Sequence, residues 1–144
     1  TEPLPNTILN SDFFAVRNSL LLIDNPVLYP AWLLHAKKEN KTIREIRNVA
    51  FSYWLKNEHV IEYLLPNLII TLVVKSNLEV EKAIPYMNSD YSEYLVKVLA
   101  DDYSEEKWNW IKKLTGIHKL TYKLSPDIEA EGTFYKALIE NSIE

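Results

Sequence analysis

The sequence predicts a mainly α fold, with about six or seven helices stacked as hairpins and a small C-terminal β element. Only 2 of its 144 residues are glycine, and a glycine-poor chain suits helices better than a β-sandwich. Several apolar segments open with Ser, Thr or Asn, the residues that cap helices. The apolar content of 47% is that of a globular protein, which excludes a disordered chain.

The most apolar stretch, residues 63–75, lies near the middle of the chain and carries no charge before Lys75. It is too short to span a membrane, which takes about 20 residues, so we expect the fold to cover it on most sides. Pro66 in a first turn and Lys75 at a C-terminus favour a helix, although the run 68–74 is also compatible with a buried strand. We expect the most buried side chains to include Leu68, Ile69, Leu72 and Trp54.

Apolar residues recur at helical spacing along most of the chain. Two capping boxes, one starting at Thr42 and the other at Ser76, indicate helix starts. Ser104 opens a further helix, which Gly116 is placed to end. The predicted helices cover residues 12–23, 30–39, 43–57, 77–84, 90–100 and 105–114, together with the central run, which residues 58–65 precede as a helical continuation kinked or broken at Pro66.

The pattern changes near the C-terminus. Residues 118–124 alternate strictly, with His118, Leu120, Tyr122 and Leu124 on one side, which predicts a half-buried strand. Segment 133–139 is compatible with either a helix or a strand that pairs with it. We therefore expect one domain, 1–144, with an extended arm at 1–9, a helical body at 10–116 and a strand plus C-terminal element at 117–144.

A weak internal repeat supports the stacked arrangement. Residues 28–34 and 64–70 share a Leu-x-Pro-x pattern followed by three apolar residues, at an offset typical of helical repeats. The segment 63–75 resembles the first helix of a HEAT-type hairpin, whose outer helix contains a proline. The resemblance covers two helices and one proline, and it implies stacked helical hairpins; an irregular bundle is the alternative.

Several kinds of chemistry are excluded by composition. The chain has no cysteine, so it has no disulfide, thiolate nucleophile or Cys-ligated zinc. Two glycines cannot build a phosphate-binding loop. Glu58, His59 and Glu62 could share a metal, but a solvated helix start explains them more simply, and we expect no metal and no cofactor. The sequence favours a non-enzymatic role, and a catalytic site assembled only by the fold stays an open alternative.

The acidic, tyrosine-containing block 86–106 is the best candidate for a binding surface. The chain carries a net charge of −4, tyrosine is frequent at interface hot spots, and clustered acids attract basic partners. This predicts a protein-binding module, such as an inhibitor, an immunity-type protein or a regulatory adaptor, with a basic protein as its partner. The predicted contact residues are Tyr94, Asp101, Asp102, Tyr103, Glu105 and Glu106.

A winged-helix-like DNA-binding regulator is the alternative. A helix followed by a lysine-bearing strand and a possible second strand has that outline, although the set lacks arginine and the chain is acidic overall. The residues concerned are Lys107, Lys112, Lys113, Lys119 and Lys123. Helix caps and solvated helix ends account for many of these charges as well. No signal peptide or spanning run is present, so we expect a cytoplasmic protein without a membrane partner. The chain does not begin with Met, which is compatible with removal of an N-terminal targeting segment.

Overall fold

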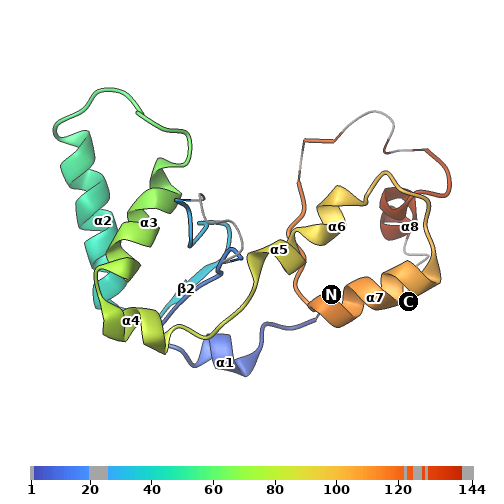
Figure 1. Cartoon of the computed structure of the whole chain (residues 1–144), viewed down its shortest axis with the longest axis horizontal. Coiled ribbons are helices and arrows are strands. Elements are labelled where there is room, and N and C mark those ends of the chain that lie inside the picture. The colour runs from blue at the N-terminus through green and yellow to red at the C-terminus, as the bar shows by residue number, and fades with distance from the viewer. Residues whose placement is uncertain (1, 20–25, 122, 125–127, 129, 141–144) are drawn as a thin grey trace. The chain divides into compact units, whose positions relative to one another are not determined.

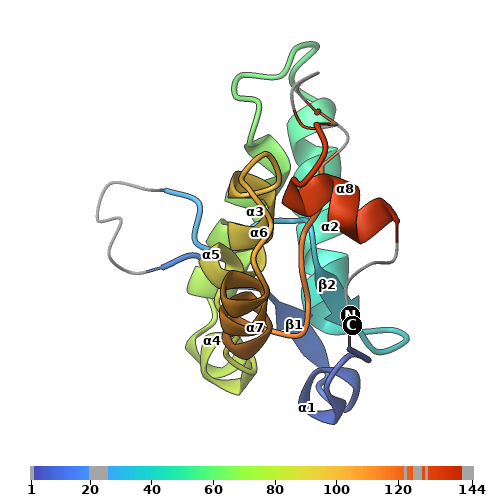
Figure 2. The same cartoon turned by 90° about the vertical axis from the view of Figure 1, so that its right-hand side faces the viewer.

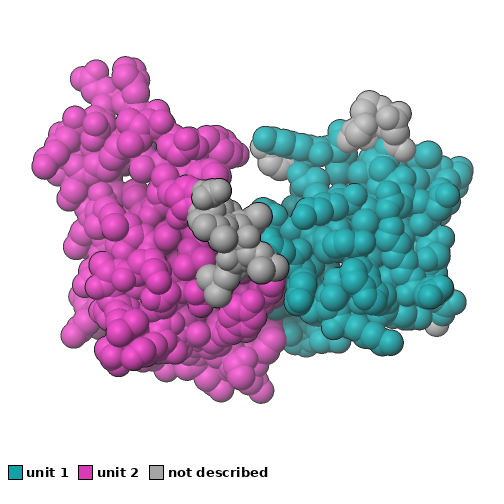
Figure 3. Space-filling model, in the orientation of Figure 1, with its two compact units in different colours: residues 1–3, 90–144 teal, residues 4–89 magenta. Residues whose placement is uncertain are grey.

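The computed structural model describes residues 2–19, 26–121, 123–124, 128 and 130–140. The chain divides into two compact units, unit 1 with residues 1–3 and 90–144 and unit 2 with residues 4–89 (Figure 3). Over the described residues there are eight helices and a two-stranded antiparallel sheet (Figure 1). The mainly α class with a small β element is therefore correct, and the expectation of a single domain stays a prediction.

The sheet belongs to unit 2 and lies near the N-terminus, not near the C-terminus as predicted. After α1 (Asn6–Leu9), strand β1 (Phe13–Ala15) pairs antiparallel with β2 (Leu34–Ala36), and Phe14 lies opposite His35 (Figure 2). The helices predicted over 12–23 and 30–39 are wrong, although residues 20–23 lie outside the described part. Residues 13–16 are all buried, and a strand covered on both faces has the same continuous apolar sequence as a buried helix.

Three helices complete unit 2: α2 (Lys41–Trp54), α3 (Leu65–Lys75) and α4 (Leu78–Ala83). α2 and α3 lie side by side (Figures 1 and 2). The caps fall at asparagines near the predicted positions: the side chain of Asn40 accepts from Ile43 N at 3.1 Å, and that of Asn77 accepts from Val80 N at 3.2 Å. The helical prediction for the central run is confirmed, with Pro66 in the first turn of α3.

The stacked helical hairpins of a HEAT-like repeat are wrong. The first copy of the repeated pattern, 28–34, enters β2 instead of forming a helix. The helix predicted over 58–65 is a loop until α3 begins at Leu65. The shared Leu-x-Pro-x pattern therefore marks two different local structures, since proline suits the first turn of a helix and also an extended segment.

Unit 2 packs around one face of α3. Its core holds Phe13, Ala15, Tyr29, Ile70 and Val74. On the neighbouring face, the Thr71 hydroxyl oxygen accepts from Leu28 N and Tyr29 N, each at 3.1 Å. The side-chain oxygen of Asn67 accepts from Ala31 N at 2.9 Å. These bonds fix the segment before β2 against α3.

The packing of α3 tests the predicted core. Ile69 is buried at 7% exposure as predicted, and Leu68 is half-buried. Leu72 is 60% exposed and Trp54 is 48% exposed, so those two predictions are wrong. Because Ile70, Thr71 and Val74 face the sheet and the segment before β2, Leu72 is turned toward solvent.

Unit 1 contains α6 (Tyr94–Lys97), α7 (Glu105–Leu114), α8 (Phe134–Ile139) and all but the first residue of α5 (Ser89–Ser92). Its core consists of Leu95, Val98, Leu99, Trp108, Ile111, Ile128 and Phe134. The predicted start of α7 is confirmed, since the Ser104 hydroxyl oxygen accepts from Lys107 N at 3.2 Å. The helix predicted over 90–100 is interrupted at Glu93 and forms the two short helices α5 and α6, followed by a turn at 98–100.

The predicted C-terminal strand is absent from the described residues of 117–124, and Tyr122 lies outside them. Segment 133–139 resolves as a helix, capped by the Thr133 hydroxyl, which accepts from Lys136 N at 3.2 Å. Gly116 does not adopt the left-handed conformation predicted for it. Its carbonyl accepts from Glu2 N at 3.1 Å, and a Cβ there would lie 2.6 Å from the Glu2 carboxylate, so close approach explains this glycine.

Candidate functional site

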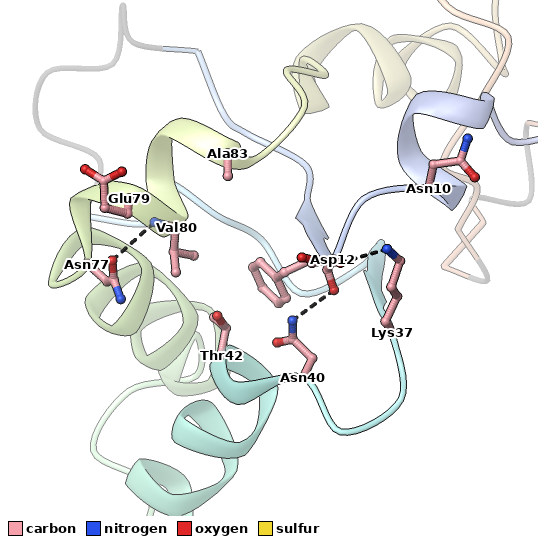
Figure 4. A pocket seen from close by; sticks show the side chains of 10 residues that line it. Asn10, Asp12, Lys37, Asn40, Thr42, Asn77, Glu79, Val80 and Ala83 are labelled. Carbon is pink, nitrogen blue, oxygen red and sulfur yellow. Dashed lines mark hydrogen bonds and ion pairs between the residues drawn. The ribbon is translucent and has the colours of Figure 1, made fainter.

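A polar cavity of about 600 Å³ opens in unit 2 (Figure 4). It forms where the residues just before β1 and just after β2 meet the first turns of α2 and α4. Three separate segments of the chain, 10–13, 37–42 and 77–83, therefore contribute to it. Its lining residues are Asn10, Asp12, Phe13, Lys37, Asn40, Thr42, Asn77, Glu79, Val80 and Ala83.

Asp12 is the best-anchored charge in this cavity. Its carboxylate accepts a hydrogen bond from Lys37 Nζ at 2.7 Å, and its backbone oxygen accepts from the side chain of Asn40 at 2.9 Å (Figure 4). The hydrogen bond from Lys37 lowers the pKa of the Asp12 carboxyl below its usual value. Asp12 is therefore ionised at neutral pH and is held in place by its own backbone and by its neighbour.

Other polar groups of the cavity have capacity left for a ligand. No protein partner is recorded, within the part of the chain that is described, for the second carboxylate oxygen of Asp12, the carboxylate of Glu79 or the side chain of Asn10. Phe13, which is 5% exposed, and the side chains of Val80 and Ala83 supply an apolar part of the wall. Carboxylate and amide groups beside an apolar surface suit a ligand that carries several hydroxyl groups.

The sequence did not single out this cavity. In sequence, Asp12 lies at the start of the helix predicted over 12–23, and Lys37 lies within the one predicted over 30–39. Glu79 completes the capping box that starts at Ser76, so each of these residues has a local explanation. The remaining signal, polar residues at the ends of several segments, becomes informative only once the β1–β2 pairing brings those ends together.

A second cavity in unit 2, of about 400 Å³, is apolar. It lies between α2, α3 and the start of β2. Its lining residues are Ala31, Leu34, Ile46, Ala50, Trp54, Val60, Tyr63, Leu65, Pro66, Ile69 and Ile70.

The six residues of the predicted partner surface all belong to unit 1: Tyr94 begins α6, and the other five lie just before or within the first turn of α7. The four acids are exposed, and Asp101 pairs with Lys107. The two tyrosines are half-buried: Tyr94 meets the ring of Trp110 edge-on at 5.0 Å, and Tyr103 meets that of Phe134 at 5.2 Å. Asp101 lies three residues beyond Val98, the C-cap of α6. The partner surface stays a prediction.

The lysine set of the DNA-binding alternative is dispersed. Lys107 and Lys112 lie over the rings of Phe134 and Trp108, at 5.5 and 5.6 Å, and Lys119 pairs with Glu93 at 3.1 Å. Lys113 and Lys123 are exposed. Since neither predicted strand forms among the described residues, the outline of a winged helix is missing.

The remaining candidates concern metals and membranes. Glu58, His59 and Glu62 lie in the loop before α3. Wherever the structure describes the chain, it has no group of three or more His, Asp and Glu side chains able to hold a metal ion. Among the described helices, none has the length and apolar character needed to cross a bilayer.

His118 of unit 1 is half-buried, and its two ring nitrogens are buried. Among the described residues, neither nitrogen has a hydrogen-bond partner, and the same holds for the nearby Ser92 hydroxyl and Trp108 Nε1. Lys119 N donates to Ser92 O at 2.9 Å, and the rings of Trp108 and His118 lie 6.0 Å apart, which places the three side chains in one neighbourhood. Burial lowers the pKa of His118 below its usual value of about 6.5, because the apolar surroundings disfavour the charged ring.

We expect acid to destabilise unit 1 through this histidine. The unfolded chain takes up the proton at a higher pH than the folded one, so the contribution of His118 is complete above about pH 6.5. It is lost as the pH falls below that value toward the lowered pKa. Urea unfolding between pH 7.5 and 5 should show the loss, and His118→Gln should remove this part of the pH dependence. The exposed control His59→Gln should retain it; a profile unchanged by His118→Gln would contradict the assignment.

Taken together, the described residues form a mainly α protein with a polar cavity suited to a hydroxyl-rich ligand. A protein-family model described as "Capsular polysaccharide synthesis protein" matches residues 1–138, and the chain belongs to this family. The family gives no support to an inhibitor, an immunity-type protein or an adaptor. No curated protein and no solved structure is detectably similar to the chain.

Proposed function

We propose that this protein takes part in building a capsular polysaccharide and that the polar cavity of unit 2 binds a saccharide unit of the substrate or product. Family membership supports the first part of the proposal. The observation that supports the second is the combination, in one cavity, of the Asp12 and Glu79 carboxylates with asparagine amides and an apolar wall. Sugars carry vicinal hydroxyl groups next to apolar C–H faces. The carboxylates and amides can hydrogen-bond the hydroxyls, and the apolar wall can pack against the C–H face.

The charge of the cavity limits the kind of sugar. Asp12 is paired with Lys37, which leaves Glu79 as an acid without a recorded ion pair among the described residues. The Glu79 carboxylate would repel an anionic sugar, whereas it can accept hydrogen bonds from the hydroxyl groups of a neutral sugar. A neutral hexose unit is therefore the ligand that we expect.

Nuclear magnetic resonance titration with methyl glycosides of glucose, galactose and mannose tests the cavity directly. Amide shifts should map to 10–13, 37–42 and 77–83, and methyl glucuronide should bind more weakly. Asp12→Asn combined with Glu79→Gln should weaken binding about tenfold or more, because hydrogen bonds to charged groups contribute about 1.5–3 kcal/mol. The matched control Glu105→Gln with Glu106→Gln alters two exposed acids of unit 1 and should leave binding unchanged.

Capsule formation tests the biological role. Deleting the gene in its host should reduce the extracted capsular polysaccharide, and the wild-type gene should restore it. The Asp12→Asn, Glu79→Gln variant should restore less at an equal protein level. Full capsule in the deletion strain would refute a role in synthesis, and full restoration by the variant would refute the cavity as the saccharide site.

A further inference from the structure

Unit 2 exposes large apolar side chains where α2 ends and the loop to α3 follows. Elsewhere in the described residues such side chains are exposed singly or in pairs, but here they gather within a short stretch of chain. Leu55 is 85% exposed, Tyr63 83% and Ile61 76%. We name this stretch the tip surface; it consists of Phe51, Trp54, Leu55, Val60, Ile61, Tyr63 and Leu64. Isolated exposed apolar residues are ordinary, but a contiguous group of them indicates a binding surface.

The loop that carries the tip surface is held in shape from within. The Tyr53 hydroxyl donates to His59 O at 2.5 Å and accepts from Ile61 N at 3.1 Å. At the start of the loop, the side chain of Asn57 donates to Tyr53 O at 2.8 Å, and Leu65 N donates to Glu62 O at 3.0 Å at its end. These bonds fix the backbone of the loop that joins α2 to α3 (Figure 1). Because the side chains of Leu55 and Ile61 are largely exposed, they are presented to solvent on an ordered loop.

The outer face of α2 adds basic residues behind the tip. Lys41, Arg44 and Arg47 are exposed on this face, and the guanidinium of Arg47 lies 6.0 Å from the ring centre of Phe51, one turn further on. Neither Arg44 nor Lys41 takes part in a recorded ion pair within the described residues. Along this face the helix therefore changes from basic to apolar toward the tip.

We propose that the tip surface docks onto an anionic lipid membrane. Tryptophan and tyrosine are the aromatic residues typical of the membrane–water interface, and the tip surface contains Trp54 and Tyr63. Apolar side chains that bind a membrane interface enter it by about 5–10 Å, and basic residues near the surface are attracted to anionic headgroups. With α2 steep to the surface, Arg47 lies about 12 Å behind Leu55, at the depth of the lipid headgroups.

Apolar contact is the main source of binding in this proposal. Glu45, Glu58 and Glu62 lie in the same part of the chain and oppose the attraction of the basic residues to anionic lipid. The apolar cavity beside the tip surface shares Trp54, Val60 and Tyr63 with it, which extends the apolar area. Capsular polysaccharide must cross a membrane to reach the outside of the cell, so a membrane surface also fits the family. The proposal departs from the expectation of no membrane partner, because sequence does not reveal which apolar residues stay exposed.

Sedimentation with vesicles tests the proposal on the full chain. The vesicles contain three parts phosphatidylcholine to one part phosphatidylglycerol, and pure phosphatidylcholine serves for comparison. The protein should sediment with the mixed vesicles and less with the neutral ones. Leu55→Ser combined with Ile61→Ser should lower the partition coefficient about tenfold or more, since each buried side chain contributes about 1.5–3 kcal/mol. Both residues are so exposed that the fold should be unchanged by circular dichroism.

Two matched controls distinguish binding by the tip surface from non-specific binding by other exposed apolar or basic residues. Leu72→Ser with Leu78→Ser removes two side chains of unit 2 that are 60% and 59% exposed, and should leave binding unchanged. Arg44→Gln should weaken binding to the mixed vesicles about fivefold, as one charge contributes about 1 kcal/mol at an anionic surface, whereas Lys82→Gln on α4 should not.

Three results would overturn the proposal. The wild-type protein could stay in the supernatant with both kinds of vesicle. The Leu55→Ser, Ile61→Ser variant could sediment as the wild type does. Size-exclusion chromatography could instead show a dimer that this variant abolishes, without vesicle binding, and the tip surface would then be a contact between two copies.

Discussion

Phe134→Ala should destabilise unit 1 by about 3–5 kcal/mol, one of the two largest effects that we expect from a single substitution. Phe134 is completely buried at the start of α8, with Tyr103 edge-on to its ring and Lys107 over its face. Its backbone nitrogen also donates to Asp101 O at 3.0 Å, so the residue joins α8 to the segment before α7. Removing the ring loses the free energy of burial and leaves a cavity that the surrounding backbone cannot easily fill.

Urea unfolding followed by far-UV circular dichroism measures this loss. The control is Ile139→Ala, on the same helix but 56% exposed, which should cost less than about 1 kcal/mol. Equal small losses for both variants would mean that α8 does not pack on α7 and α6.

The same contacts change how the predicted acidic surface has to be tested. Tyr103 supports the ring of Phe134, and its backbone nitrogen donates to Gly132 O at 2.7 Å. Tyr103→Ala would therefore weaken the fold of unit 1 together with any partner contact. The exposed Glu105 and Glu106 are the residues whose substitution can report on binding alone.

The sequence predicted helix positions correctly where a residue at the helix start has a specific role, such as a cap or a first-turn proline. Ser104 caps α7 as predicted, and Pro66 lies in the first turn of α3. The sheet could not be predicted in the same way. The run from Phe13 to Val16 is apolar throughout, and only its pairing with residues 34–36, about twenty residues later, decides that it is a strand.

The candidate site depends even more on long-range packing. Asp12 and Lys37 meet because β1 pairs with β2, and Glu79 joins them because α4 folds back toward the same sheet. The spacing of these residues along the sequence does not predict that they come together. The tip surface was not predicted for a related reason: Trp54 continues the apolar stripe of α2 in sequence, but at the last residue of that helix it is 48% exposed.

The second large effect concerns α3. Ile70→Ala should cost about 2–5 kcal/mol, because Ile70 is 3% exposed within the core of unit 2. Leu72→Ala, two residues further along the same helix, should cost less than about 1 kcal/mol, since Leu72 is 60% exposed. The two side chains are comparable in size and lie about 200° apart around the helix axis.

Comparing these two substitutions tests which face of α3 is buried. The sequence leaves this question open because almost every position from 68 to 74 is apolar. The structure answers it through Thr71, whose hydroxyl binds the backbone of residues 28 and 29 and so sets the rotation of α3. Thr71→Val keeps the shape of the side chain and removes the two hydrogen bonds. It should therefore lower stability while leaving Ile70→Ala more costly than Leu72→Ala. A larger loss for Leu72→Ala than for Ile70→Ala, measured by urea unfolding, would place the opposite face of α3 in the core and would contradict this arrangement.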